Sequence, residues 1–207
     1  KGLFFDDTLK YCLNCKRCEV ACPSGVRIAD IIQAARIKYS GEAPKLRDMI
    51  LASTDIMGGL ATKVAPVANF ALGLKPTKVV MDAVLKVDKH RTFPKYASRT
   101  FESWYKKNVK AFQDTFKRHV SFFHGCYVNY NYPQLGKDLI SVMNALGYGV
   151  HLLENEKCCG TALISNRMID QAKKNAVNNV ESIRKSVYER QMPVIGTSSS
   201  CNFTIRD

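Results

Sequence analysis

The chain has 207 residues, 46% of them hydrophobic, which is enough for one good core and a smaller second domain. Its eight cysteines cluster along the sequence, and together with the chain length this argues against a small secreted domain held by disulfides. The 31 basic and 18 acidic side chains give a net charge of +13, which favours an anionic partner: a membrane surface, a nucleic acid or an acidic protein.

The first element is a run of four cysteines followed by Pro23, at spacings of two, two and three residues. Bacterial-type ferredoxins hold [4Fe–4S] clusters with this spacing, because a tight loop turns three thiolates towards one cluster and the fourth towards another. A zinc site would divide its ligands into two separated pairs. The run therefore predicts an iron–sulfur site in a loop held between helices, the second of which ends near Tyr39. Its members are Cys12, Cys15, Cys18 and Cys22.

A basic middle stretch follows over residues 44–118. Residues 49–74 are mostly apolar, but charged residues and a proline interrupt them, so they lack the roughly 20 continuous apolar residues of a membrane-spanning helix. Residues 75–119 hold twelve Lys or Arg and four Asp or Glu, a difference of +8. Most of the excess positive charge therefore lies in this part of the chain.

Aromatic and apolar residues recur at helical spacing near the end of this stretch, with lysines between them. One interpretation is a basic amphipathic helix that lies on a membrane surface. The other is an ordinary helix whose aromatic stripe faces the core and whose lysines are solvated. A nucleic-acid interface has no recognised binding motif in its support. The stripe consists of Phe101, Trp104, Tyr105, Val109, Phe112 and Phe116.

From residue 119 onwards the pattern alternates between strands and helices. Residues 120–123, 150–153 and 193–195 read as strands, and residues 133–146 and 166–190 read as the helices between them. This strand–helix–strand–helix–strand order predicts a parallel sheet with right-handed crossovers.

The remaining cysteines each come just after one of the predicted strands. Because ligands bind beyond the carboxyl ends of strands in open α/β sheets, we expect these loops to converge on one site. Adjacent thiolates suit a multi-iron cluster. The alternative is that these cysteines are small buried apolar side chains without a ligand role. They are Cys126, Cys158, Cys159 and Cys201.

The two cysteine sets together resemble a known family. The second set, with Gly160 after the cysteine pair, resembles the cysteine-rich CCG domain of heterodisulfide reductase B-type subunits. Preceded by a ferredoxin-type run, it is similar to the C-subunit family of anaerobic glycerol-3-phosphate dehydrogenases. The matching stretches are residues 123–131, 133–139 and 156–160.

The resemblance implies a fold of mixed α and α/β class in three parts. Residues 1–43 would be half of a two-cluster [4Fe–4S] ferredoxin-like domain, built from helices. Residues 44–118 would be a basic amphipathic helical segment. Residues 119–207 would be a first, truncated CCG domain with a βαβαβ parallel sheet.

In function, the resemblance implies a non-catalytic electron-transfer and membrane-docking subunit. It would receive electrons from flavin-containing dehydrogenase subunits and pass them towards the quinone pool, at the cytoplasmic face of the bacterial inner membrane. All eight cysteines would be cluster ligands, with two [4Fe–4S] clusters in the complete ferredoxin-like domain. A related glycolate, lactate or heterodisulfide oxidoreductase subunit is the alternative within this class.

The sequence departs from the family pattern at two points. Only one ferredoxin run and one CCG half are present, and the chain starts at Lys1, so we expect an internal piece of a longer protein. Ser198 stands where the family has the first cysteine of a closing CxxC, and serine is a poor ligand for soft metals. This argues against a five-cysteine non-cubane cluster and leaves a four-cysteine cluster, or none, at the CCG site.

One alternative comes from a different class of function. The charge of +13 and the cysteine clusters would also suit a zinc-bearing nucleic-acid-binding protein. The spacing of the first run and the position of the other cysteines at strand ends argue against it, so we expect no nucleic-acid partner.

Overall fold

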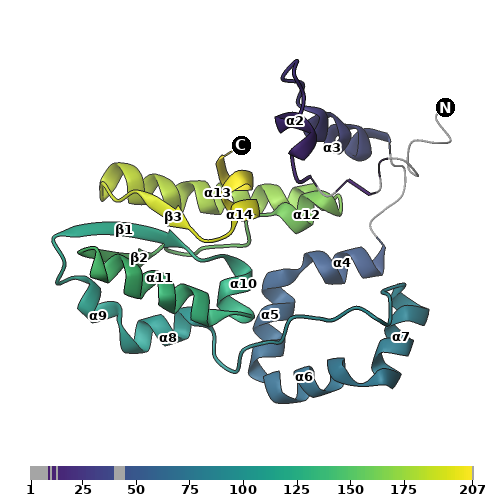
Figure 1. The fold of residues 1–207 in the computed structure, drawn as a ribbon, viewed down its shortest axis with the longest axis horizontal. Coiled ribbons are helices and arrows are strands. Elements are labelled where there is room, and N and C mark those ends of the chain that lie inside the picture. Colours follow the sequence, from purple (N-terminus) through teal and green to yellow (C-terminus); the bar gives the residue numbers. More distant parts are fainter. Residues whose placement is uncertain (1–8, 10, 13, 40–44, 207) are drawn as a thin grey trace.

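The computed structural model describes residues 9, 11, 12, 14–39 and 45–206. Three regions follow one another along the chain (Figure 1): a small N-terminal helical unit, a helical arm, and a parallel sheet with helices on both faces. The N-terminal unit contains α2 (Arg17–Val20) and α3 (Ile28–Tyr39). The arm contains α4 (Leu46–Ala52), α5 (Thr54–Lys63), α6 (Ala65–Gly73) and α7 (Lys75–Leu85).

The sheet has three parallel strands in the order β2-β1-β3, which confirms the predicted sheet. The central strand pairs Val120 with Val150 on one side and Phe122 with Ile195 on the other. Its last four residues are buried, because neighbouring strands and helices enclose it on all sides. The strands are β1 (Arg118–Phe123), β2 (Tyr148–Leu152) and β3 (Val194–Gly196).

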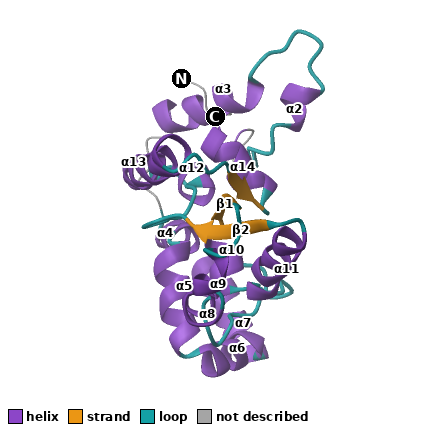
Figure 2. Cartoon of the chain, turned by 90° about the vertical axis from the view of Figure 1, so that its left-hand side faces the viewer, coloured by secondary structure: helices purple, strands orange, loops and turns teal. Residues whose placement is uncertain are grey.

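Helices cover both faces of the sheet (Figures 1 and 2). On one face lies α13 (Ile169–Arg184), continued by the π-turn η1 (Lys185–Glu189). On the other lie α8 (Phe101–Asn108), α9 (Lys110–Gln113) and α11 (Pro133–Ala145). The short helices α10 (Gly125–Tyr130), α12 (Thr161–Ser165) and α14 (Ser199–Arg206) begin beyond the ends of the strands.

The first part of the aromatic stripe of residues 101–116 belongs to the core. Phe101 and Tyr105 are buried, and Phe101 lies so near α11 that a Cβ atom at Gly136 would come within 2.5 Å of its ring. The predicted continuous helix is wrong, because Val109 leaves helical geometry and separates α8 from α9. Phe112 beyond this break is 56% exposed. The buried core cluster comprises Phe101, Tyr105, Val120, Phe122, Val128, Ile140 and Val150.

The same two helices cover the outer edge of β2. The Tyr105 hydroxyl donates to the carbonyl of Val150 at 2.7 Å, and the Gln113 side-chain oxygen accepts from the Val150 amide at 2.9 Å. Both outward backbone groups of an edge residue are therefore satisfied by side chains. This contact explains why part of the basic middle stretch folds onto the sheet.

The arm contacts the sheet region through α5. Gly58 of α5 lies against Tyr130 of α10, where a Cβ atom would come within 2.4 Å of the tyrosine ring. Between α7 and α8 the chain returns past α6, where the side-chain amide of Asn69 exchanges two hydrogen bonds of 2.8 Å with the backbone of Tyr96. Within the part of the chain that the structure describes, no helix combines the length and apolar character that a bilayer crossing requires.

The division of the chain at residues 43 and 118 stays a prediction. The first boundary lies outside the described residues. At the second, α8 and α9 precede residue 118 but pack on the sheet that follows it.

Candidate functional site

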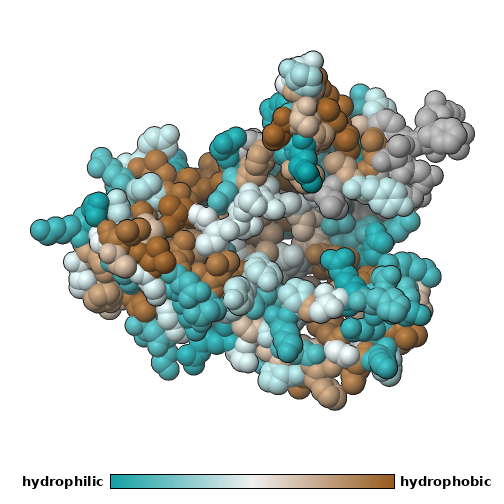
Figure 3. All heavy atoms as spheres, viewed as in Figure 1, coloured by the Kyte–Doolittle hydropathy of each residue, from teal (hydrophilic) through white to brown (hydrophobic). Residues whose placement is uncertain are grey.

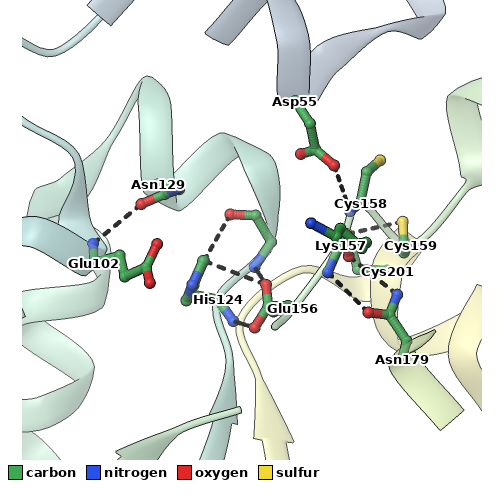
Figure 4. A network of polar contacts seen from close by, with 11 residues as sticks. Asp55, Glu102, His124, Asn129, Glu156, Lys157, Cys158, Cys159, Asn179 and Cys201 are labelled. Carbon is green, nitrogen blue, oxygen red and sulfur yellow. Dashed lines mark hydrogen bonds and ion pairs between the residues drawn. The ribbon is translucent and has the colours of Figure 1, made fainter. Parts of the chain in front are cut away.

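The loops after the three strands bring the second cysteine set together, as the sequence predicts. Cys126 lies in the first turn of α10 after β1, and Cys201 lies in the first turn of α14 after β3. Cys158 and Cys159 lie between β2 and α12. The thiols of Cys159 and Cys201 are hydrogen-bonded at 3.3 Å between sulfurs (Figure 4), well beyond a disulfide bond length.

Contacts between thiols link Cys126 to Cys158, Cys158 to Cys159 and Cys159 to Cys201, and we call these four thiols the row. The hydrogen bond to Cys158, followed by burial, raises the pKa of Cys126 far above the usual thiol range. At the other end of the row, the hydrogen bond from Cys159 lowers the pKa of Cys201. Ser198 lies beside it, and its hydroxyl accepts from the Cys201 amide at 3.4 Å.

Side chains from distant helices hold the backbone on both sides of the cysteine pair. Asp55 of α5 accepts a hydrogen bond from the Cys158 amide at 2.8 Å, and Asn175 of α13 donates to the Cys158 carbonyl at 3.2 Å. Asn179, one turn later, bonds both backbone groups of Lys157, at 2.9 and 3.0 Å (Figure 4). Gly160 follows with φ of +96°, a conformation that suits glycine. The cysteine pair is therefore fixed from both sides of the sheet.

A buried carboxyl group ties the loop of Cys126 to the loop of Cys158. Glu156 accepts hydrogen bonds from the amides of Gly125 at 2.7 Å and His124 at 3.1 Å (Figure 4). Burial raises the pKa of Glu156 to about 8 and lowers the pKa of the His124 imidazole. The His124 ring packs against Phe101 at 5.6 Å between centroids, so this histidine has a structural role in the core.

A cavity of about 670 Å³ opens beside the Cys126 end of the row. Cys126, Cys158 and Glu156 line it, together with the basic residues Lys106, Lys110, Lys157 and Arg190. Cys159 and Cys201 do not line it. The row therefore has one end at a cavity and the other end at helices α12 and α14.

The first cysteine run lies in a tightly curved loop around α2. Asn14 and Lys16 both adopt left-handed backbone conformations, with φ of 53° and 60°. Such conformations cost about 1–2 kcal/mol for a non-glycine residue, less for asparagine, and are common at ligand-binding loops. The side-chain oxygen of Asn14 is buried without a hydrogen-bond partner among the described residues. Cys15 and Cys18 are exposed, and Cys12 and Cys22 are half-buried.

The donor atoms at both places are those that an iron–sulfur cluster requires. Thiols are soft ligands, and the first run presents them on a curled loop while the second presents them as a contiguous row. Within the described ranges, no group of three or more His, Cys, Asp or Glu side chains is arranged to hold a single metal ion. The fit to an iron–sulfur cluster therefore rests on the donor chemistry, which is that of thiols and not of imidazoles or carboxylates.

Sequence reasoning missed the side chains that position the row. Asp55 lies 103 residues before Cys158, and its only signal was an acidic residue within an apolar stretch. Glu156 stands directly before the Lys-Cys-Cys-Gly motif, but nothing in the sequence indicates that its side chain is buried. Asn175 and Asn179 are one helical turn apart on α13, and their weak helix propensity was a faint signal for a polar contact.

Comparisons of the sequence with known proteins identify relatives that are named as iron–sulfur or cysteine-rich proteins. Residues 120–206 match the cysteine-rich domain family CCG. The chain is 56% identical over 206 residues to the C subunit of anaerobic glycerol-3-phosphate dehydrogenase from Escherichia coli K12, covering the whole chain and 52% of that protein. It is 24% identical over 203 residues to an uncharacterized iron–sulfur protein of Methanococcus maripaludis, covering 98% of the chain and 34% of that protein.

A shorter similarity, 27% identity over 88 residues, joins the chain to lactate utilization protein A 1 of Bacillus mycoides, with 42% of the chain and 34% of that protein covered. No solved structure matches the chain. The chain spans about half the length of its E. coli relative. It is a homologue of the C subunit of anaerobic glycerol-3-phosphate dehydrogenase, and its residues 120–206 match the CCG family of cysteine-rich domains.

Proposed function

We propose that this chain is part of an electron-transfer subunit of anaerobic glycerol-3-phosphate dehydrogenase. The subunit would receive electrons from flavin-containing dehydrogenase subunits and pass them towards quinone, at the cytoplasmic face of the inner membrane. The observation that carries the proposal is 56% identity along the whole chain to a C subunit of that enzyme. The shorter similarity to a lactate utilization protein supports a second candidate, an iron–sulfur subunit for lactate or glycolate oxidation.

The two cysteine sets have separate roles in this proposal. Cys12, Cys15, Cys18 and Cys22 would hold [4Fe–4S] clusters of the ferredoxin type, and the row from Cys126 to Cys201 would hold a further cluster. When bound, such clusters transfer one electron at a time at potentials set by charge, hydrogen bonds and burial. The chain itself supplies the environment. Asp55, Glu156 and the asparagines of α13 fix the loops around the row.

The first test is iron and sulfide analysis of the full-length protein, purified and reconstituted without oxygen, with EPR spectra recorded after dithionite reduction. We expect a brown protein with the signal of reduced [4Fe–4S] clusters. The iron content would also show whether the row with Ser198 holds a cluster. A colourless protein that binds DNA in a salt-sensitive manner would reject the proposal and support the zinc-bearing alternative.

We also propose that the arm is the part of the chain that docks on the membrane surface. Apolar side chains of α5–α7 point outward: Ile56 and Leu60 of α5 are exposed, as are Val80 and Val84 of α7, each pair one turn apart. Residues 54–91 carry six basic and three acidic side chains, and one of the acids, Asp55, faces the cysteine row. In Figure 3 apolar and polar side chains alternate over α6 and α7, at the lower right. Exposed apolar side chains interspersed with basic ones suit a membrane surface with anionic lipid headgroups.

Val67→Asp in α6 is expected to weaken binding to phosphatidylglycerol-containing vesicles by about tenfold or more. Burial of a valine side chain is worth about 1.5–3 kcal/mol, and an aspartate would also repel the anionic surface. Val177→Asp in α13 is the matched control, since the two valines are 69% and 73% exposed. Vesicle flotation of the full-length protein measures both. Equal loss in the two variants, or equal binding to neutral vesicles, would reject the arm as the docking surface.

A further inference from the structure

The N-terminal helical unit lies against the sheet region at α12 and α14 (Figures 1 and 2). These are the two short helices at the Cys159–Cys201 end of the thiol row. Helix α12 begins directly after the Cys-Cys-Gly sequence, and α14 carries Cys201 in its first turn. The hydroxyls of Thr161 in α12 and Thr204 in α14 are hydrogen-bonded at 2.6 Å, which joins the two helices. The N-terminal unit therefore contacts the helices beside Cys159 and Cys201, whereas the cavity lies beside Cys126 and Cys158.

Arg36 of α3 makes the first link across this contact. Its guanidinium donates through Nη1 to the carbonyl of Cys12 at 3.1 Å and through Nη2 to the carbonyl of Ser165 at 3.0 Å. Ser165 is the last residue of α12. One planar side chain thus bridges the backbone of the first cysteine run and the end of the helix that follows Cys159. Lysine cannot reproduce this arrangement, because its three N–H donors all lie on one nitrogen atom, whereas the two bonds of Arg36 come from two nitrogens of a planar group.

Lys16 makes the second link. Although it is a lysine, it is only 6% exposed, and it lies between Cys15 and Arg17 in the curled loop. Its ammonium pairs with Asp30 of α3 and lies 5.5 Å from the ring centre of Phe203 in α14. Phe203 stands two residues after Cys201. A cation over an aromatic face is worth about 0.5–2 kcal/mol, more when it is desolvated.

We infer that this contact is the route by which the first cysteine run and the thiol row exchange electrons, and that Arg36 is its positioning residue. The inference rests on the proposed function, because it requires a cluster at each site. With a cluster bound at each site, the one would lose one electron and the other would gain it. No bond is made or broken. Arg36 and Lys16 act by holding the loop of the first run against α12 and α14.

Arg36→Met in the full-length reconstituted protein tests the inference. We expect the wild type to show magnetic coupling between the two sites in EPR spectra. The variant should keep the iron content and the individual EPR signals, but it should lose this coupling and exchange electrons severalfold more slowly. Hydrogen–deuterium exchange should become faster in α12 and in residues 14–22. Arg36→Lys should give an intermediate result. Lys38→Met, on the same helix and exposed, is the matched control and should behave as the wild type.

Phe203→Leu provides a second variant on the opposite side of the contact. Phe203 is partly exposed, so the change should leave the fold intact while it removes the contact to Lys16. Unchanged coupling in both variants, with iron retained, would overturn the inference and leave the proposed function untouched. Loss of iron from the first run in Arg36→Met would also overturn it, since Arg36 would then only stabilise that loop. Absence of iron from the wild type would instead overturn the proposed function.

Discussion

Cys15→Ser in the full-length protein is expected to remove one cluster and to abolish electron flow to quinone. Serine is a poor ligand for soft metals, so one thiolate of the ferredoxin-type run is lost. Cys15 is exposed, and no core contact is removed, so the fold should remain. Iron analysis should show a loss of about four iron atoms, the content of one [4Fe–4S] cluster. Quinone reduction by the reassembled dehydrogenase should fall to background.

Ser24→Ala is the control for this substitution, because Ser24 is exposed close to the same run and has no sulfur to lose. It should keep both iron content and quinone reduction. The decisive comparison is between the two variants in one reassembled complex. Normal quinone reduction by Cys15→Ser would defeat the assignment of the run to electron transfer. Loss of activity in both variants would point to disruption of the loop and not to loss of a ligand.

Phe101→Ala is expected to lower the free energy of unfolding by about 3–5 kcal/mol. Phe101 is fully buried, and its ring contacts Phe122 and His124 with centroids 5.7 and 5.6 Å apart. Removing it leaves a cavity between α8, α11 and β1. Because the His124 loop leads into Cys126, the change should also loosen the entrance to the thiol row. Urea unfolding of the protein before and after the substitution measures the effect.

Phe112→Ala is the matched control, since it is the same change in the same aromatic stripe. Phe112 is 56% exposed and lies beyond the break at Val109, so its loss should change stability by about 0.5 kcal/mol or less. If both substitutions destabilised the protein equally, the assignment of Phe101 to the core and of Phe112 to the surface would be wrong. If neither did, the interpretation of the stripe as a membrane-facing surface would regain support.

Local patterns explain why the sheet and the thiol row could be predicted. The strands are short apolar runs with clear limits, and the parallel order places all their carboxyl ends at one edge. The positions of Cys126, Cys159 and Cys201 follow from those two facts. The structure places β2 and β3 within two residues of the predicted ranges. No detailed knowledge of side-chain packing was needed for this part of the fold.

The arrangement of the middle stretch could not be predicted in the same way. Asp55 and Cys158 lie 103 positions apart, and a single carboxylate in an apolar run gives no indication of its partner. The break at Val109 lies within a helical pattern and serves a tertiary contact, since it lets Gln113 reach the backbone of Val150. Tertiary contacts of this kind override local propensity. The same reason explains why Arg36 gave no signal of its bridge to Ser165.

Helices α8 and α9 cover the outer edge of β2, so the two edges of the sheet are not equivalent. Tyr105 and Gln113 occupy both outward hydrogen-bonding groups of Val150, so another strand cannot be added beside β2 without displacing α8 and α9. Among the described residues, β3 pairs only with β1, and its opposite side has no strand. An additional strand would therefore meet less obstruction next to β3 than at Val150 of β2. The two edges of the sheet therefore differ: the β2 edge is covered by helices, and the β3 edge, on the side of α14 and Cys201, is the one where a strand would be added.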